Sequence, residues 1–282
     1  MSRRGLFGAA VLAAGVAATG CAAAHGETNT PDKPAGPPNT PKAAPVSETM
    51  TPPGGPAAVA ARHAAEQPQL WGTEMRGITS TFAANGKQMA LTFDACGGPG
   101  NSDMDQSLVD FLTVQQIPAT LFVNKRWVDA NPARVAQLAG NPLFELANHG
   151  VAHKPLSVTG RSAYGIAGTG SAQEAVDEVW ANHERLTQLT GKPPRFFRAG
   201  TAHYDEVAVA IVNELGETPV GFSINADFGA TASSTQVQKS MNAAAPGAIS
   251  LAHFHRPQSG TGAGMIAVLP TLRAAGFTFV HL

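Results

Sequence analysis

Between residues 89 and 282, apolar runs of strand length alternate with segments that have a helical pattern. The run from Met89 to Phe93 is typical: it is apolar and rich in β-forming residues. We predict strands near 89–94, 118–123, 143–148, 195–198, 218–223, 248–253 and 277–281. We predict helices near 104–116, 131–140, 172–190, 204–215, 234–244 and 262–275, the last kinked or restarted at Pro270.

Strict alternation of strand and helix predicts a parallel sheet with crossover helices. Seven such strands between residues 71 and 282 are close to the lower limit of a β/α barrel, and an open doubly wound sheet is the alternative. No G-x-G-x-x-G follows the first strand, so nothing supports a dinucleotide site.

The first 21 residues have the pattern of an export signal. Arg3 and Arg4 precede an apolar run, 6–18, that is too short to span a bilayer. The paired arginines resemble a twin-arginine signal. Residues 18–21 (ATGC) resemble a bacterial lipobox, in which Cys21 would be lipidated, and an ordinary secretory signal is the alternative. The lipobox and the ordinary secretory signal both predict export. The lipobox also predicts a lipid anchor on the outer side of the cytoplasmic membrane.

The next segment changes in composition. Residues 22–56 contain nine prolines and no aromatic residue, so they cannot bury enough apolar surface to become ordered. We expect 22–70 to be a disordered Pro/Ala-rich tether, with 57–67 as a stretch that could form a short helix. The globular domain is expected to cover 71–282.

Charge and cysteine content indicate which partners and which disulfides to expect. The formal net charge is −1, and no basic patch is visible, so we expect no nucleic-acid partner. We expect a monomer. The chain has two cysteines, Cys21 and Cys96. If Cys21 is lipidated, Cys96 has no partner for a disulfide.

Polar residues stand where several predicted strands end. Asp94 lies at the end of the first strand. The Gly/Pro sequence at 97–100 (GGPG), which cannot continue a regular strand, follows shortly after it. Polar groups after later strands lie at 148–153 (NHGVAH), 198–201 (RAGT), 225–227 (NAD) and 253–255 (HFH). In a β/α barrel the carboxyl ends of the strands form one rim, where catalytic groups lie. We therefore expect an active site there.

His149 and His153 are four residues apart. On a helical turn this spacing places both imidazoles on one face, where they can bind one metal ion. The alternative is a pair of surface or core histidines. Imidazole and carboxylate ligands with open positions suit catalytic zinc, so we expect a divalent metal, Zn²⁺.

Residues 89–282 resemble the NodB-homology polysaccharide deacetylases, carbohydrate esterase family four. The matching motifs occur in order: T-F-D at 92–94, H-x-x-x-H at 149–153, an arginine motif at Arg198, Asp227 after the fifth strand, and L-x-H at 251–253. The resemblance implies a distorted barrel of seven or eight β/α units. It also implies an enzyme that uses a divalent metal to remove acetyl groups from N-acetylated sugars.

The resemblance also implies roles for these residues. Amide hydrolysis needs an activated water and a proton for the leaving amine. Asp94 would take the proton of the water, and His253 would protonate the amine. Asp227 would orient His253, and Arg198 would lower the pKa of Asp94.

The first departure from the family concerns the metal. The usual second aspartate of the first motif is Ala95 here, so the third ligand is missing from its normal position. Candidates for this ligand are Asp94 itself, Cys96, Asp103, Asp105 or water. A free cysteine is usually a small buried hydrophobe, and we expect Cys96 to pack rather than bind metal.

Two further departures affect substrate choice. Residues 198–201 (RAGT) replace the common R-x-P-Y-G, and Phe228 follows Asp227 where the family has tryptophan. We expect Thr201, Tyr204 and His255 to contact the substrate. His203 is another possible substitute for the missing aromatic residue, and His255 is a weaker candidate for the acid.

Three functions stay open. The leading one is N-deacetylation of a cell-wall or extracellular polysaccharide. The second is an O-acetyl esterase of the same family, acting on xylan-like glycans. The third is a glycan-binding lipoprotein on a decayed enzyme fold. Ala95 favours the third, and the residues that remain oppose it: Asp94, His149, His153, Arg198 and His253.

Overall fold

The computed structural model describes residues 52–282. The expected signal peptide, the lipid-anchor residue Cys21 and the tether up to residue 51 lie outside the described residues. Within 52–282, no helix is both long enough and apolar enough to cross a membrane.

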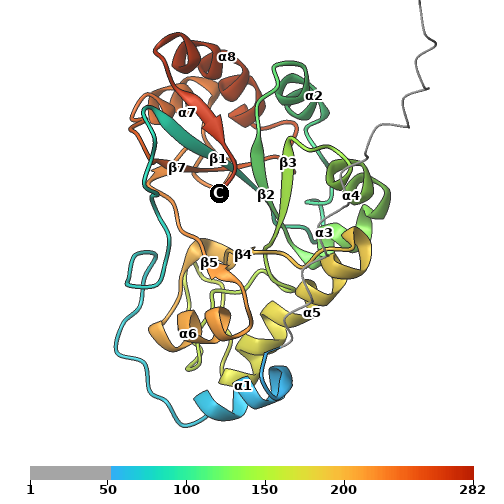
Figure 1. The fold of residues 1–282 in the computed structure, drawn as a ribbon, viewed down its shortest axis with the longest axis vertical. Coiled ribbons are helices and arrows are strands. Elements are labelled where there is room, and N and C mark those ends of the chain that lie inside the picture. Colours follow the sequence, from blue (N-terminus) through green and yellow to red (C-terminus); the bar gives the residue numbers. More distant parts are fainter. Residues whose placement is uncertain (1–51) are drawn as a thin grey trace, which may run out of the picture. The chain divides into compact units, whose positions relative to one another are not determined.

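One parallel sheet forms the centre of the fold (Figure 1). Its strands are β1 (Gln88–Ala95), β2 (Ala119–Val123), β3 (Phe144–Asn148), β4 (Phe196–Phe197), β5 (Thr218–Pro219), β6 (Ile224–Asn225), β7 (Ile249–His253) and β8 (Thr278–Val280). Hydrogen-bonded neighbours run β5-β4-β3-β2-β1-β7-β6, and β8 pairs with the start of β1. The predicted parallel α/β sheet is confirmed, and the short strand β6 is an addition to it.

The chain that precedes β1 connects the β5 side of the sheet to the β7 side. The backbone nitrogen of Thr79 donates to the carbonyl of Pro219 at 2.9 Å, and Gly221 donates back to Thr79 at 2.9 Å. A few residues on, Phe82 donates to the carbonyl of Gly247 at 3.0 Å. The sheet is therefore a distorted β/α barrel, as predicted, and not an open doubly wound sheet.

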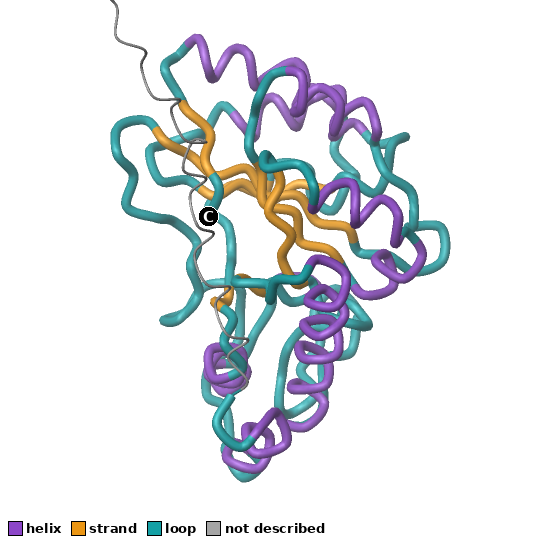
Figure 2. Tube along the Cα trace, turned by 45° about the vertical axis from the view of Figure 1, so that its right-hand side comes forward, coloured by secondary structure: helices purple, strands orange, loops and turns teal. Residues whose placement is uncertain are grey.

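Helices lie above, to the right of and below the strands in Figure 2, and loops lie on the left side. The helices are α1 (Gly55–His63), α2 (Gln106–Val114), α3 (Lys125–Ala130), α4 (Pro132–Ala139), α5 (Ala172–Thr190), α6 (Glu206–Glu214), α7 (Ser234–Met241) and α8 (Gly260–Ala274). All six predicted helices are present, α1 overlaps the stretch 57–67 that we expected could form a short helix, and α3 is additional. The expected restart at Pro270 is wrong, because α8 continues through it. Pro270 lies on the exposed side of the helix, so its ring does not disturb the core.

The boundary of the folded unit needs a correction. Helix α1 lies in the segment expected to be a tether, yet Val59 and Ala60 on it are 0% and 4% exposed and belong to the same core cluster as residues of α5 and α6. Arg62 and His63, at the end of α1, contact Glu214 of α6 at 2.6 and 3.0 Å. The folded part therefore includes α1 and does not begin at Trp71.

Side chains along β1 alternate between the core and the side of the sheet that carries polar groups. Leu91, Phe93 and Ala95 face the largest core cluster, which also contains residues of α2, α7 and α8. Thr92 and Asp94 face the other way and contact a buried arginine of another strand end. A strand of period two thus carries core residues on one side and functional groups on the other.

Candidate active site

A cleft of about 540 Å³ opens where β1 and β7 end. The sequence-predicted residues that line it are Asp94, Cys96, His153, Thr201, His253 and His255. His149 is buried and contacts Asp94 and Cys96, while Arg198 is buried against Asp94. The structure thus brings together side chains that are separated by as much as 161 residues in the sequence.

Asp94 and Arg198 form a buried ion pair. Nη1 of Arg198 donates to Oδ1 of Asp94 at 2.7 Å. Burial raises the pKa of the Asp94 carboxyl, but the positive charges of Arg198 and His253 and the hydrogen bond from Arg198 outweigh it, so the pKa lies below its ordinary value. Asp94 is therefore ionised at neutral pH, and its Oδ2 stays free of the arginine.

Arg198 is completely buried and uses its whole guanidinium group. Nη1 also donates to Oγ1 of Thr92 at 2.8 Å, and Nη2 donates to the carbonyl of Gly221 at 2.8 Å. Its cation lies 4.1 Å from the ring centre of Phe122. A buried cation is tolerated only when it is paired and hydrogen-bonded, so Arg198 and Asp94 depend on each other.

His149 has a defined tautomer. Its Nδ1 lies 2.8 Å from the carbonyl oxygen of Arg198, which can only accept, so Nδ1 carries the proton and Nε2 offers a lone pair. Nε2 lies 3.6 Å from Oδ2 of Asp94 and 3.9 Å from Sγ of Cys96. Burial lowers the pKa of His149, which keeps it in the neutral form that binds metals.

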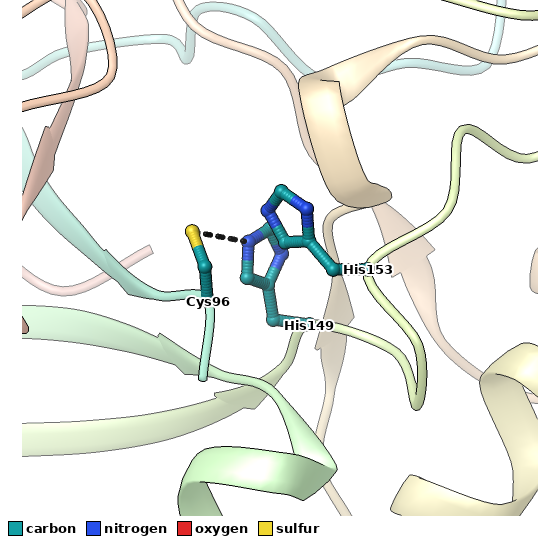
Figure 3. A group of neighbouring side chains, drawn as sticks. All are labelled: Cys96, His149 and His153. Carbon is teal, nitrogen blue, oxygen red and sulfur yellow. Dashed lines mark hydrogen bonds between the residues drawn. The ribbon is translucent and has the colours of Figure 1, made fainter. Parts of the chain in front are cut away.

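Cys96, His149 and His153 form the candidate metal centre (Figure 3). Their ligand atoms all lie within 4.8 Å of one another, and no other group of three or more such side chains meets this criterion among residues 52–282. Figure 3 shows the sulfur of Cys96 directed at His149, with the ring of His153 beside it. Two imidazoles and a thiol are a donor set that fits zinc.

The expected packing role of Cys96 is not what the structure shows. Cys96 is half-buried and lines the cleft. Burial raises the pKa of its thiol, but hydrogen bonds and charges from His153 and His253 lower it to about 7. A thiol with this pKa is partly a thiolate at neutral pH.

Two of the other candidates for a third ligand, Asp103 and Asp105, lie elsewhere. Asp103 contacts Arg134 at 3.6 Å, and Asp105 caps α2 by accepting from the nitrogen of Leu108 at 3.0 Å. Asp94, which we expected to bind the metal, is not in the cluster of three ligand side chains, and Arg198 holds one of its oxygens.

The loop between the two histidines is not a helical turn. His153 has a left-handed backbone (φ 60°) and so has Gly150 (φ 74°). The carboxylate of Glu178, on α5, accepts from the backbone nitrogens of Ala152 at 2.9 Å and Lys154 at 3.2 Å. Glu178 is buried and was missed in the sequence, where the only signal is an acid on the buried face of a helix.

His253 is paired with a carboxylate. Its Nδ1 lies 2.9 Å from Oδ1 of Asp227, and its backbone nitrogen donates to Oδ2 at 2.7 Å. Thr261, which the sequence did not suggest, donates its hydroxyl to the same Oδ2 at 2.8 Å. Burial lowers the pKa of His253, but the charge of Asp227 raises it well above its ordinary value. His253 is therefore an imidazolium at neutral pH.

His255 has the opposite protonation state. Its Nδ1 lies 3.2 Å from the carbonyl oxygen of Asp94. Burial and the charge of His253 lower its pKa to about 4. A histidine that is neutral at pH 7 has no proton to give at the reaction pH, so His253 is the better acid.

Of the expected substrate contacts, Tyr204 needs a correction. Its side chain is completely buried, and its hydroxyl accepts from the nitrogen of Ala199 at 2.8 Å and lies 3.3 Å from the carbonyl of Phe197. It therefore holds the chain around residues 197–199 and does not reach the cleft. Thr201 does line the cleft, with a left-handed backbone (φ 66°).

The rim of the cleft carries aromatic side chains. Tyr164 is 81% exposed and Phe228 is 55% exposed, and both line the cleft. The ring of Tyr164 also lies edge-on to His203, at 5.4 Å. We identified Phe228 in the sequence only as a departure from tryptophan, and Tyr164 was missed because it belongs to a loop without a recognisable motif.

Residues 83–220 match the family model described as polysaccharide deacetylase. A bifunctional xylanase/deacetylase from Pseudobutyrivibrio xylanivorans is 24% identical over 203 residues. That match covers 72% of this chain but 31% of the relative, so the chain spans about a third of the length of that protein.

Three solved structures have a similar fold. A family four carbohydrate esterase pseudoenzyme from Bacillus anthracis is 19% identical, with a TM-score of 0.60 over 72% of this chain and 66% of that chain. A peptidoglycan N-acetylglucosamine deacetylase is 22% identical, with a TM-score of 0.60 over 72% and 89%. A family four acetyl xylan esterase from Clostridium thermocellum, in complex with cobalt, is 22% identical, with a TM-score of 0.57 over 69% and 88%.

Proposed function

Residues 83–220 belong to the polysaccharide deacetylase family, and we propose that this chain is a zinc-dependent hydrolase that removes acetyl groups from N-acetylated sugars of a cell-wall or extracellular polysaccharide. One observation carries the proposal. An ionised carboxylate, Asp94, and a protonated imidazole, His253, line the same cleft as two side chains of the candidate metal centre, Cys96 and His153.

The metal would be held by His149, His153 and a third donor of the same cleft. When bound, zinc polarises the acetyl carbonyl and makes a water molecule more acidic. The neutral form of His149, with its Nε2 lone pair, supports this assignment because a metal ligand must be unprotonated.

Asp94 acts as the general base. Its Oδ1 is held by Arg198, so Oδ2 is the oxygen that accepts the proton of the attacking water. Arg198 has two effects here: it fixes the carboxylate and it lowers the pKa of Asp94, which keeps the base ready at neutral pH.

His253 acts as the general acid. Because its Nδ1 is paired with Asp227, the proton on Nε2 is the one that passes to the leaving nitrogen of the sugar. Asp227 stabilises the imidazolium form before transfer, and Thr261 and the backbone of His253 hold Asp227 in place. The leaving amine would be a poor leaving group without this proton.

Acetate release tests the proposal. The zinc-loaded chain is incubated with chitooligosaccharide, peptidoglycan and acetylxylan, and acetate is measured. We expect release from an N-acetylated substrate and a loss of about 10²-fold or more in turnover for Asp94→Asn and for His253→Ala. Asp110→Asn, an exposed aspartate on α2, is the matched control and should keep full turnover. No acetate from any of the three substrates would overturn the proposal.

A second candidate is an O-acetyl esterase. The fold is similar to that of an acetyl xylan esterase, and the same base and acid can serve an ester, whose leaving group is a sugar oxygen. Acetate release from acetylxylan alone would favour this function.

A third candidate is a glycan-binding protein without activity. Ala95 offers no ligand atom at the position of the usual second aspartate, and the fold is also similar to that of a pseudoenzyme. The intact pairs Asp94–Arg198 and His253–Asp227 argue against it, because binding alone requires neither a base nor an acid. Glycan binding without any acetate release would favour this candidate.

A further inference from the structure

We propose that Cys96 is the third protein ligand of the metal and that its thiolate takes the place of the carboxylate that Ala95 lacks. The inference rests on the proposed function and deepens it, because it assigns the metal centre of this chain a thiolate donor. It also separates the metal ligands from the general base.

The alternation along β1 explains why residue 96 reaches the cleft. Ala95 points to the core, where it packs in one cluster with Leu91 and Phe93. Asp94 points the other way, and Cys96 comes two residues later, so the alternation places it on the side of Asp94. The chain thus carries a sulfur donor one residue beyond the position that has no donor.

Asp94 is already paired with Arg198. One of its oxygens accepts from Arg198 at 2.7 Å, and it does not belong to the cluster of ligand atoms. Among the described residues that line the cleft, Asp94 is the only carboxylate. If Asp94 serves as the base, the cleft contains no acidic side chain to complete the metal centre.

The separation of the donor atoms supports ligation. Sγ of Cys96 lies 3.9 Å from Nε2 of His149. Zinc binds sulfur at about 2.3 Å and imidazole nitrogen at about 2.0 Å, so two such bonds reach up to about 4.3 Å. Nε2 of His149 is the unprotonated nitrogen, because Nδ1 donates to the carbonyl of Arg198.

The imidazole of His153 is held independently of the metal. His153 lies in a left-handed conformation, and the backbone on either side of it donates to the carboxylate of Glu178. A loop fixed in this way keeps the imidazole close to Cys96, and all three ligand atoms lie within 4.8 Å of one another.

A thiolate changes which metal the centre prefers. Sulfur is a soft donor, and a site with two imidazoles and one thiolate favours zinc over manganese and magnesium, which prefer oxygen. A Cys96→Asp variant has the oxygen donor of the family's usual set. We expect its zinc affinity, relative to its manganese affinity, to be lower than that of the wild type.

Cobalt spectroscopy tests the ligand directly. Cobalt(II) bound to a thiolate has a charge-transfer absorption in the near ultraviolet, which oxygen and nitrogen ligands do not produce. We expect this band in the cobalt-loaded full chain and in Asp94→Asn. We expect it to be absent in Cys96→Ser, with zinc affinity reduced by more than the roughly 10–100-fold that the loss of an outer-shell partner costs.

The matched control is Cys21→Ser, which removes the other cysteine of the chain and should leave the band unchanged. Circular dichroism confirms that each variant is folded, and Cys96→Ala serves as a second variant if Cys96→Ser is not. A cobalt-loaded wild type without the band, or a Cys96→Ser protein with unchanged zinc affinity, would overturn the inference.

The two proposals can fail separately. Acetate release by a wild type that lacks the thiolate band leaves the proposed function standing and overturns the assignment of Cys96. A thiolate band in a wild type that releases no acetate supports Cys96 as a ligand and overturns the proposed function.

Discussion

Two ion pairs at the cleft each combine a carboxylate with a cationic side chain, but the group that lines the cleft is the carboxylate in one pair and the imidazolium in the other. In the pair of Asp94 and Arg198, the permanent cation lowers the pKa of the acid. In the pair of His253 and Asp227, the carboxylate raises the pKa of the imidazole. One cleft therefore contains an ionised carboxylate and a protonated imidazole at the same pH, which is what a base and an acid in one reaction need.

The pH dependence of activity follows from these pairs. The base works above the lowered pKa of Asp94, and the acid works below the raised pKa of His253, so activity should be level across neutral pH and fall at alkaline pH. In Asp227→Asn the carboxylate that raises the pKa of His253 is gone, and the alkaline fall should move to lower pH. The measurement is turnover against pH, with Asp110→Asn as the control. An alkaline limb that stays in place would show that His253 is not the acid.

Helix α5 links the fold to the metal centre. It runs from Ala172 to Thr190 beside β3, and Glu178 on it accepts hydrogen bonds from the backbone of Ala152 and Lys154 on both sides of His153. Burial raises the pKa of Glu178, and the hydrogen bonds from Ala152 and Lys154 oppose this rise. The helix thus fixes a loop that has no regular structure of its own, in the way that outer-shell groups hold metal ligands.

Glu178→Gln tests this role. The glutamine amide has one acceptor oxygen and an NH2 group that only donates, where the carboxylate has two acceptor oxygens, so it cannot receive all the N–H groups of the loop. We expect zinc affinity to fall by about 10–100-fold. Zinc titration of the folded protein is the measurement. Glu184→Gln, an exposed position on the same helix, should bind zinc like the wild type. Equal zinc affinity in both variants would mean that the loop around His153 keeps its conformation without Glu178.

Helix α1 belongs to the folded unit, and this changes where the chain can be shortened. Val59 is completely buried within the cluster that also contains Val179 and Val212. Removing residues 1–70 uncovers these side chains, and we expect the free energy of unfolding to fall by about 2 kcal/mol or more. Removing residues 1–51 should leave it unchanged. Thermal or urea unfolding of the two shortened chains tests this, and equal stability would show that α1 contributes nothing.

At the scale of the whole molecule, we propose that the barrel works outside the cytoplasmic membrane, because residues 1–21 resemble an export signal that ends in a lipobox. A lipid on Cys21 would anchor it.

Cell fractionation tests the anchor. Cys21→Ala should move the protein from the membrane fraction to the soluble exported fraction, because the lipid attachment site is lost. Cys96→Ala should stay in the membrane fraction and is the matched control. Unchanged membrane association of Cys21→Ala would rule out the anchor.

The sequence by itself determined the order of the elements and the parallel sheet. Periodicity is a local property, and it was enough to place β1, β2, β3, β7 and the six helices α2 and α4 to α8 within a few residues. Short elements such as β6 and α3 were missed, because two to six residues contain too little pattern. The strand ends also revealed Asp94, His149, Arg198 and His253, because polar groups that follow buried strands stand out against the apolar runs.

Only the tertiary structure decided which of these groups meet. Arg198 and Asp94 are 104 residues apart, and Cys96 and His149 are 53 apart, so no local pattern could show that the first two form a pair or that the second two share a cluster. The first pair was expected only from the family resemblance. The burial of Tyr204 and the support of the loop by Glu178 depend in the same way on how α5, β4 and the loops pack. Local sequence determines which face of an element is apolar. The direction of a polar side chain at its end is set by contacts with distant segments, and these contacts place Cys96 beside the two histidines.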